Sequence, residues 1–234
     1  MNAARLDSAL AILREAEALA PAAFSSSLGA EDMVLLDLIA GEGLAIAVFT
    51  LDTGRLPEET HALLRAAEAR YGRRIDTFHP DAGELAQLLR RDGANGFYDS
   101  VAQRKACCEV RKVAPLRRAL AGRRAWVTGL RSQQSAERAQ VAARSRDAAL
   151  GIEKFSPLHD WSEDEVWSYI RSRNLPYNAL HDRHYPSIGC APCTRAIAVG
   201  EDPRAGRWWW ESRESKECGL HARPRAEPAP QELA

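Results

Sequence analysis

The sequence predicts an α/β protein with a mostly parallel sheet and helices on both faces of that sheet. Short apolar runs alternate with stretches of helical spacing up to about residue 155, and this alternation is typical of parallel sheets. Three of the apolar runs are followed by polar loops, "SSSLG", "LDTGR" and "GLRSQQS". Because ligands bind beyond the carboxyl ends of parallel strands, we expect these loops to gather at one edge of the sheet.

The first half of the chain shows the alternation clearly. Apolar positions at helical spacing end at Pro21, which predicts an N-terminal helix. "AAFSSSLG" follows as a strand that runs into a serine-rich turn. Glu31 and Asp32 open the helix "EDMVLLDLIA", where acidic residues suit the positive helix end. "LAIAVFTLDTG" is a second strand, and Pro57 fits the first turn of the helix "PEETHALLRAAEARYG".

The pattern continues and then changes. "RRIDTFHP" reads as a third strand, "AGELAQLLRR" as a helix and "RAWVTGLRS" as a fourth strand. After about residue 155, "WSEDEVWSYIRSRN" is a helix with Ser162 as its N-cap and Glu165 three residues later. The remainder is rich in loops, and "ARPRAEPAPQELA" has the composition of a disordered tail. We expect one domain over residues 1–221 and a disordered tail over residues 222–234.

Charge and hydropathy exclude several classes of protein. The 234 residues hold 32 Lys and Arg against 32 Asp and Glu, whereas nucleic-acid and anionic-membrane surfaces carry a basic excess. The N-terminus lacks the continuous apolar core of a signal peptide, and the apolar run "LAIAVF" is too short to span a bilayer. We therefore expect a cytoplasmic protein without nucleic-acid or membrane partners.

The five cysteines form two close pairs and one single residue. An odd number in a reducing compartment favours metal binding or catalysis over a disulfide framework. Cys107 and Cys108 are adjacent, and Cys190 and Cys193 form a CxxC motif. Four thiolates suit zinc or an iron–sulfur cluster. Adjacent side chains diverge, which favours a cluster with several iron atoms over one zinc ion. A redox CxxC is a weaker alternative, because such motifs open a helix early in a βαβ unit.

The loop "SSSLGAED" lies between a strand and a helix N-terminus, where backbone N–H groups and hydroxyls can bind phosphate or sulfate. It is not a Walker A loop, because no Gly-Lys-Ser/Thr follows. In "LDTGR", Asp52 either holds a ribose or caps its own turn. Taken singly, each loop also fits a capped turn, and the predicted convergence of the loops favours a binding site. The arginines near these loops and the cysteines suit phosphate or sulfate.

The fifth cysteine, Cys218, lies in the polar stretch "KECGLH" close to the end of the chain. Cysteine is usually buried when it serves packing, and the following residues cannot pack. Lys216 and His221 are nearby, and a cation together with an exposed position favours the reactive thiolate. The sequence therefore favours a catalytic role for Cys218.

These motifs, with "CC", "CAPCTR" and "RWWW", together resemble the assimilatory adenylyl-sulfate (APS) reductases, which are cluster-bearing relatives of phosphoadenylyl-sulfate (PAPS) reductase. The resemblance runs in order from about residue 20 to residue 221. It implies an adenine nucleotide alpha-hydrolase-like fold, with one 4Fe-4S cluster on Cys107, Cys108, Cys190 and Cys193. It implies substrate contacts from Ser25, Ser26, Ser27, Gly29, Asp52, Thr53, Lys112, Arg131, Arg138, Arg204, Arg207 and His221.

The resemblance also implies a reaction. The Cys218 thiolate would attack the sulfur of APS and release AMP, leaving an S-sulfocysteine on the enzyme. A thioredoxin thiolate would then displace sulfite, as in thiol–disulfide exchange. The cluster would organise charge around the substrate and would not carry electrons. This activity belongs to assimilatory sulfate reduction and cysteine biosynthesis. The resemblance allows a homo-oligomer, and no segment predicts its interface.

The chain departs from the family at Ser132, where relatives often have a second arginine, and at Ala136 and Glu137. We therefore expect one sulfate or phosphate contact near Arg131 and Arg138 to be weaker. A PAPS reductase, or an enzyme that accepts both nucleotides, is the nearest alternative. An ATP-pyrophosphatase-type enzyme would need an "SGGxDS" loop, which "SSSLGAED" replaces. A zinc-stabilised interaction module would leave Cys218 without a role.

Overall fold

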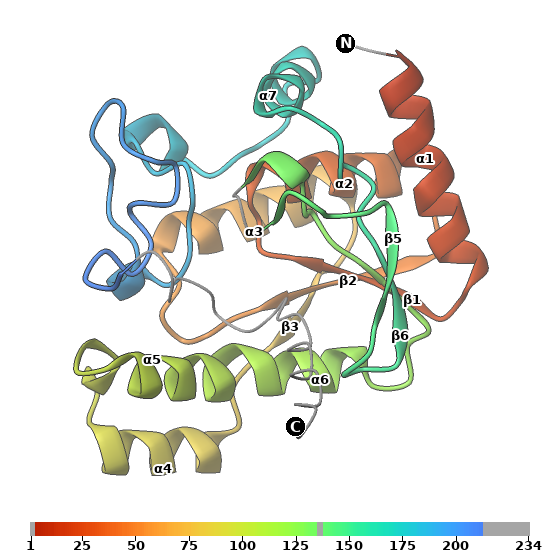
Figure 1. Cartoon of the computed structure of the whole chain (residues 1–234). Helices are drawn as coiled ribbons and strands as arrows, with labels where there is room; N and C mark the ends of the chain where they lie inside the picture. The colour runs from red at the N-terminus through yellow and green to blue at the C-terminus, as the bar shows by residue number, and fades with distance from the viewer. Residues whose placement is uncertain (1–2, 135–137, 213–234) are drawn as a thin grey trace, which may run out of the picture.

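The computed structural model describes residues 3–134 and 138–212 of the chain (Figure 1). Two of the residues predicted for the site, Cys218 and His221, and the predicted tail lie outside the described residues. The strands are β1 (Ala22–Ser26), β2 (Ile46–Leu51), β3 (Asp76–Phe78), β4 (Ala125–Val127), β5 (Arg144–Asp147) and β6 (Ile152–Phe155). The helices are α1 (Ala3–Ala18), α2 (Ala30–Gly41), α3 (Glu58–Tyr71), α4 (Ala82–Asp92), α5 (Val101–Cys108), α6 (Ala114–Leu120) and α7 (Glu163–Ser172).

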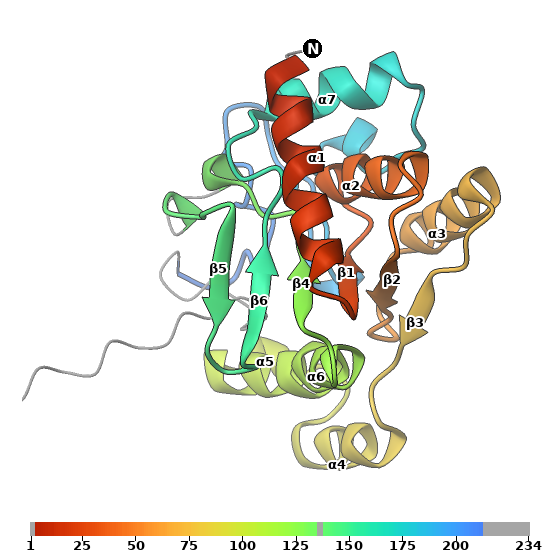
Figure 2. The same cartoon turned by 90° about the vertical axis from the view of Figure 1, so that its right-hand side faces the viewer.

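The strands form one six-stranded sheet in the order β3-β2-β1-β4-β6-β5 (Figure 2). All neighbours pair in parallel except β5, which pairs antiparallel with β6. The chain thus crosses from β1 outward to β3 and then returns to the other side of β1 with β4. This order confirms the predicted fold class.

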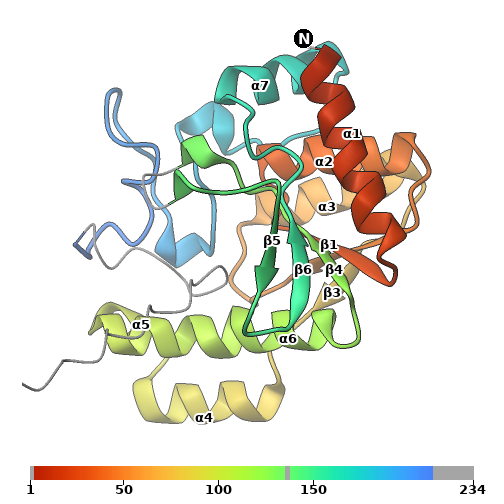
Figure 3. The same ribbon diagram turned by 45° about the vertical axis from the view of Figure 1, so that its right-hand side comes forward.

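Helices cover both faces of the sheet, as the sequence predicts. α1, α2, α3 and α7 lie on one side, while α5 and α6 lie on the other with α4 beyond them (Figures 1 and 3). Alternate strand residues enter two separate cores: Phe24 and Val127 pack toward α2, whereas Ala23 and Trp126 pack toward α6. This alternation follows from the period of two in a strand.

The predicted helices are all present, with one boundary shifted. Helix α7 has the predicted capping box, in which Ser162 and Glu165 satisfy each other's backbone N–H groups. Helix α3 begins at Glu58, so Pro57 is its N-cap and not its first residue. Of the helices described, none is long and apolar enough to cross a membrane.

Two parts of the fold were not predicted. The first is the continuous helical stretch from α5 to α6, which passes through a π-helical turn at Glu109–Val113. Its apolar periodicity is broken because Arg104 and Arg111 are buried in it. The second is the hairpin of β5 and β6. Strand β5 has the sequence RSRD and lies at an edge of the sheet, so it lacks the apolar character of a buried strand.

Candidate functional site

A cavity of about 290 Å³ lies at the edge of the sheet where β1, β2 and β4 end. The three polar loops meet there, which confirms their predicted convergence. The predicted residues that line it are Ser25, Ser26, Ser27, Gly29, Thr53, Lys112, Arg131, Arg138, Arg204 and Arg207. Residues that were not predicted also line it, among them Thr60, Trp126, Gln134 and Trp167. Gln134 belongs to the predicted loop "GLRSQQS", whereas the positions of Thr60, Trp126 and Trp167 within helices and a strand gave no signal of a site.

The loop after β1 is held by the carboxylate of Asp32, which lies in the first turn of α2. The backbone N–H and the hydroxyl of Ser27 both donate to Oδ2 of Asp32, at 2.6 and 2.7 Å. Ser26 Oγ accepts the N–H of Leu28 at 3.1 Å. Burial raises the pKa of Asp32 to about 6, although its hydrogen bonds with Ser27 act in the opposite direction. Asp32 therefore holds the loop in shape at the N-terminus of α2.

The raised pKa of Asp32 makes stability depend on pH. Its carboxyl has an ordinary pKa of 3.8 and a folded value of about 6, so the folded state binds more protons than the unfolded state between these values. The free energy of unfolding is therefore expected to fall as the pH rises through this window, and to level off above it. Asp32→Asn should remove this contribution. Urea unfolding of both proteins at several pH values tests it, and equal pH slopes in the two proteins would contradict it.

The loop after β2 links the cavity to the cysteines. Thr53 Oγ1 lies 3.2 Å from the sulfur of Cys190, and the carbonyl of Thr53 accepts Nη1 of Arg111 at 2.6 Å. Gly54 has a φ of +69°, which favours glycine, and its N–H donates to Asp52 at 2.8 Å. Asp52 thus caps its own turn and is not among the residues that line the cavity.

The cationic residues of the cavity have different partners. Arg131 is paired with Glu31 at 2.8 Å and also donates to the carbonyl of Trp161 at 3.1 Å. Its charge is thus already matched. Arg207 is buried, and its Nη1 donates to the neutral oxygens of Ser187 and Ile188, at 3.2 and 3.3 Å. Both guanidinium groups line the cavity, where they can meet an anion.

Gly189 gives the Arg207 guanidinium its space. A Cβ at this position would lie 2.3 Å from Nη2 of Arg207, so Gly189→Ala is expected to displace the guanidinium. If Arg207 binds the anionic substrate, KM should rise by about tenfold or more, because a hydrogen bond to a charged group is lost. Steady-state kinetics would measure KM, and thermal unfolding would show whether the variant keeps its fold. Gly41→Ala is the control, since a Cβ there meets nothing within 4 Å. An unchanged KM in Gly189→Ala would contradict this role for Arg207.

The four described cysteines lie together behind the cavity. Cys107 and Cys108 end α5, while Cys190 is the N-cap of the short turn Ala191–Cys193 and Cys193 is its last residue. Within the described residues none of the four is in a disulfide, and all four line one narrow cavity with Phe97. Within residues 3–134 and 138–212, no three His, Cys, Asp or Glu side chains are placed to hold a single metal ion. Thiolates are ligands of both zinc and iron–sulfur clusters, so four thiols around one cavity suit a metal cofactor.

Positive charges surround the cysteines. Burial opposes ionisation of Cys190, but Lys112, the Thr53 hydroxyl and Arg207 together lower its pKa. Burial raises the pKa of Cys193 to about 12. Lys112 lines both the cavity at the sheet edge and the cysteine cavity. Its ammonium group can therefore attract negative charge in either cavity.

A buried ion pair lies beside the cysteines. Arg104 is fully buried, and its Nε and Nη2 contact the carboxylate of Glu211 at 2.9 and 2.7 Å. Its guanidinium also lies 4.7 Å from the ring centroid of Trp208, which is buried among the cysteines. The first tryptophan of the "RWWW" run thus packs against the cysteine site.

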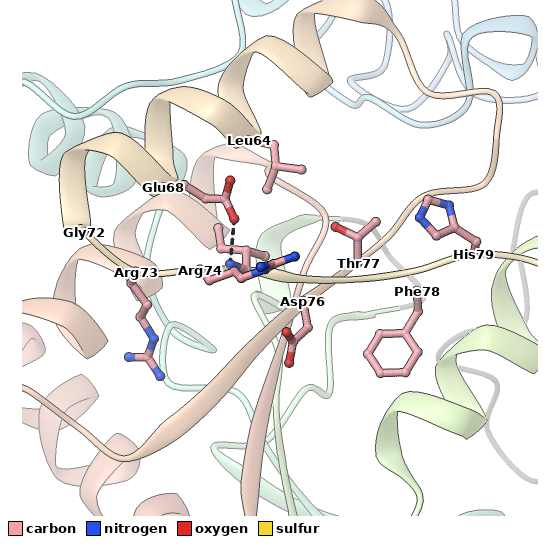
Figure 4. Close-up of a pocket in the computed structure, with 10 residues that line it drawn as sticks. Leu64, Glu68, Gly72, Arg73, Arg74, Asp76, Thr77, Phe78 and His79 are labelled. Atoms are coloured by element: carbon pink, nitrogen blue, oxygen red, sulfur yellow. Dashed lines mark hydrogen bonds between the residues drawn. The ribbon is translucent and has the colours of Figure 1, made fainter.

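A second hollow, of about 840 Å³, lies along the edge strand β3 (Figure 4). It includes Arg73, Asp76 and His79, and Glu68 accepts the N–H of Ile75 within it at 2.9 Å. It includes none of the residues predicted for the site. The smaller cavity with the cationic residues is therefore the candidate functional site.

Comparisons with known proteins agree with this site. Residues 21–196 match the family model "Phosphoadenosine phosphosulfate reductase domain". The adenosine 5'-phosphosulfate reductase of Allochromatium vinosum is 60% identical over 212 residues, covering 88% of this chain and 83% of that protein. The reductase of the same name from Neisseria meningitidis serogroup B is 54% identical, covering 86% and 82%.

Solved structures show the same fold. The phosphoadenylyl-sulfate reductase of Candida auris superposes with a TM-score of 0.69 and 25% identity, covering 81% of this chain and 90% of that chain. The FMN adenylyltransferase of Candida glabrata, in complex with FAD and pyrophosphate, has a TM-score of 0.57 at 16% identity, covering 92% and 76%. The second likeness is one of fold alone, and both place the chain among the adenine nucleotide alpha-hydrolase-like folds.

Proposed function

This chain belongs to the phosphoadenosine phosphosulfate reductase family, and from this premise we propose that it reduces APS to sulfite and AMP. The observation that carries the proposal is the cavity at the sheet edge, which Lys112, Arg204 and Arg207 line together with the loop "SSSLG". A cationic cavity of this kind suits an adenine nucleotide with a phosphosulfate group. The high identity to proteins named adenosine 5'-phosphosulfate reductase supports APS over PAPS.

We infer that the four cysteines would hold one 4Fe-4S cluster. Their thiols line one cavity, and the cations Arg104, Arg111 and Lys112 border the same cavity, which suits a negatively charged cluster with four thiolate ligands. When bound, the cluster would supply negative charge next to the site. The residues of the chain would bind and orient the substrate. Lys112 and Arg207 would neutralise the phosphosulfate, and the loop after β1 would orient the nucleotide.

The proposed reaction needs one nucleophile, and Cys218 fits that role by its place in "KECGLH". Its thiolate would form a bond to the sulfur of APS while the bond from sulfur to the phosphate oxygen breaks, which releases AMP. A thioredoxin thiolate would attack the Cys218 sulfur and displace sulfite. A second thioredoxin thiol would then release Cys218 as the thiol. The two electrons come from thioredoxin, which becomes a disulfide.

Two further properties are part of the proposal. The reaction needs a reducing compartment, and the cytoplasm suits thiols that must stay reduced. The resemblance also allows a homo-oligomer, whose interface none of the described elements identifies.

The deciding experiment uses protein purified without air. Iron and acid-labile sulfide are measured first, and about four of each per chain are expected. Sulfite release is then measured with APS or PAPS in the presence of reduced thioredoxin. A clear preference for APS supports the proposal, whereas a preference for PAPS would assign the nearest alternative. One zinc ion per chain and no sulfite from APS would refute the proposal.

A further inference from the structure

A tryptophan outside the predicted site lies against the first serine of the loop. Trp126 is in β4 and lines the cavity, and its Nε1 donates to Oγ of Ser25 at 2.7 Å. Ser25 is in β1, the neighbour of β4 (Figure 2). Ala23, two residues before Ser25, packs with Trp126 in the core toward α6. Ser25 therefore lies on the same face of the sheet.

The hydrogen bond fixes the direction in which Ser25 can donate. An indole N–H can only donate, so Ser25 Oγ is the acceptor and its own proton must point elsewhere. Among the described residues, none accepts that proton from Ser25. Since Ser25 lines the cavity, its hydroxyl is available to donate to a group inside. Ser27 differs, because its hydroxyl donates to Asp32.

Lys154 contacts Trp126 from β6, the strand that pairs with β4 on the side away from β1. Lys154 in β6 is the register partner of Trp126, and its Nζ lies 4.5 Å from the centroid of the indole. Burial lowers the pKa of Lys154 to about 8, so its ammonium stays charged at neutral pH. A cation over the face of an indole is attractive and makes the N–H a stronger donor.

We propose that Trp126, held by Lys154, is a positioning residue that makes the Ser25 hydroxyl a hydrogen-bond donor to an anionic oxygen of the bound nucleotide. This inference rests on the proposed function. Lys112 supports it, because this residue and Leu116 border the cavity from the helices on the same face of the sheet. A phosphate oxygen drawn toward Lys112 would thus meet a hydroxyl already oriented to donate. Such preorganised donors lower the cost of binding charge.

A double-mutant cycle on the full chain tests the inference. The affinity for AMP is measured by calorimetry for the wild type, Trp126→Phe, Ser25→Ala and the double variant. Trp126→Phe keeps an aromatic side chain but removes the N–H donor and part of the ring volume, so a control for the lost volume is needed. We expect about fivefold weaker binding for Trp126→Phe and about tenfold weaker binding for Ser25→Ala, the size of one hydrogen bond to a charged group. The double variant should match Ser25→Ala, because both remove the same contact.

Trp161→Phe is the matched control. Trp161 is also buried, and its Nε1 has no partner among the described residues. Its replacement should lower the melting temperature as Trp126→Phe does, yet leave AMP affinity unchanged. Lys154→Met should weaken AMP binding by about twofold in the same direction.

Two results would overturn the inference: additive losses in the double variant, about fiftyfold in all, or normal AMP affinity in Trp126→Phe. Sulfite release by the wild type separates this test from that of the proposed function. A wild type that makes sulfite from APS and binds AMP, with Trp126→Phe unaffected, refutes the inference alone. A wild type that makes no sulfite refutes the proposed function.

Discussion

Replacing Cys218 by serine is expected to abolish sulfite release from APS. A serine hydroxyl does not ionise near neutral pH, so the variant has no thiolate to attack the sulfur atom. Removal of a catalytic nucleophile typically lowers kcat by a factor of about 10⁴ or more. Sulfite release in the presence of reduced thioredoxin measures the effect.

Iron content separates the role of Cys218 from the role of the four clustered cysteines. Cys218→Ser should keep the iron and the visible spectrum of the wild type. Cys107→Ser should lose both, together with activity, because one of the four proposed ligands is gone. Near-normal turnover in Cys218→Ser would show that another group is the nucleophile.

Replacing Arg104 by methionine is expected to destabilise the protein by about 3–5 kcal/mol, because Glu211 would keep a buried charge without its partner. The Arg104 and Glu211 side chains are 0% and 3% exposed and lie 2.7 Å apart. Urea unfolding measures the change in the free energy of unfolding. The double variant Arg104→Met/Glu211→Leu should recover much of the loss, since apolar replacement of a buried pair is often neutral.

A surface pair serves as the control for this prediction. Arg14 and Glu42 lie 2.6 Å apart, but their side chains are 58% and 37% exposed. Arg14→Met should therefore cost less than about 1 kcal/mol. If Arg104→Met costs no more than Arg14→Met, the buried pair does not stabilise the fold.

The sequence predicted the part of the site that follows from strand ends. The loops "SSSLG", "LDTGR" and "GLRSQQS" meet at one edge because β1, β2 and β4 are parallel neighbours. Lys112, Arg204 and Arg207 could be predicted as site residues because basic residues cluster near the cysteines and the polar loops in the sequence. The close packing of the two cysteine pairs also follows the prediction. Their role as cluster ligands stays a prediction.

Other features depend on contacts that spacing alone cannot show. Asp52 could equally bind a ribose or cap a turn, and in the structure it accepts the N–H of Gly54. Arg131 was expected to meet substrate, but its pairing with Glu31 links residues 100 positions apart. Trp126 read only as a strand residue, because its hydrogen bond to Ser25 arises from the pairing of β1 with β4. Such contacts exist only once the sheet has formed.

The π-helical turn at Glu109–Val113 has a consequence for the insertion or deletion of residues. It contains Lys112 and lies between the cysteines that end α5 and the start of α6. Each residue of an α-helix turns the chain by about 100°, and π-helical turns carry an extra residue relative to regular winding. Deletion of one residue here could restore an ordinary helix, yet it would rotate Cys107 and Cys108 relative to α6. The thiols and the cavity at the sheet edge would then no longer share Lys112, although the hydrophobic core could remain intact.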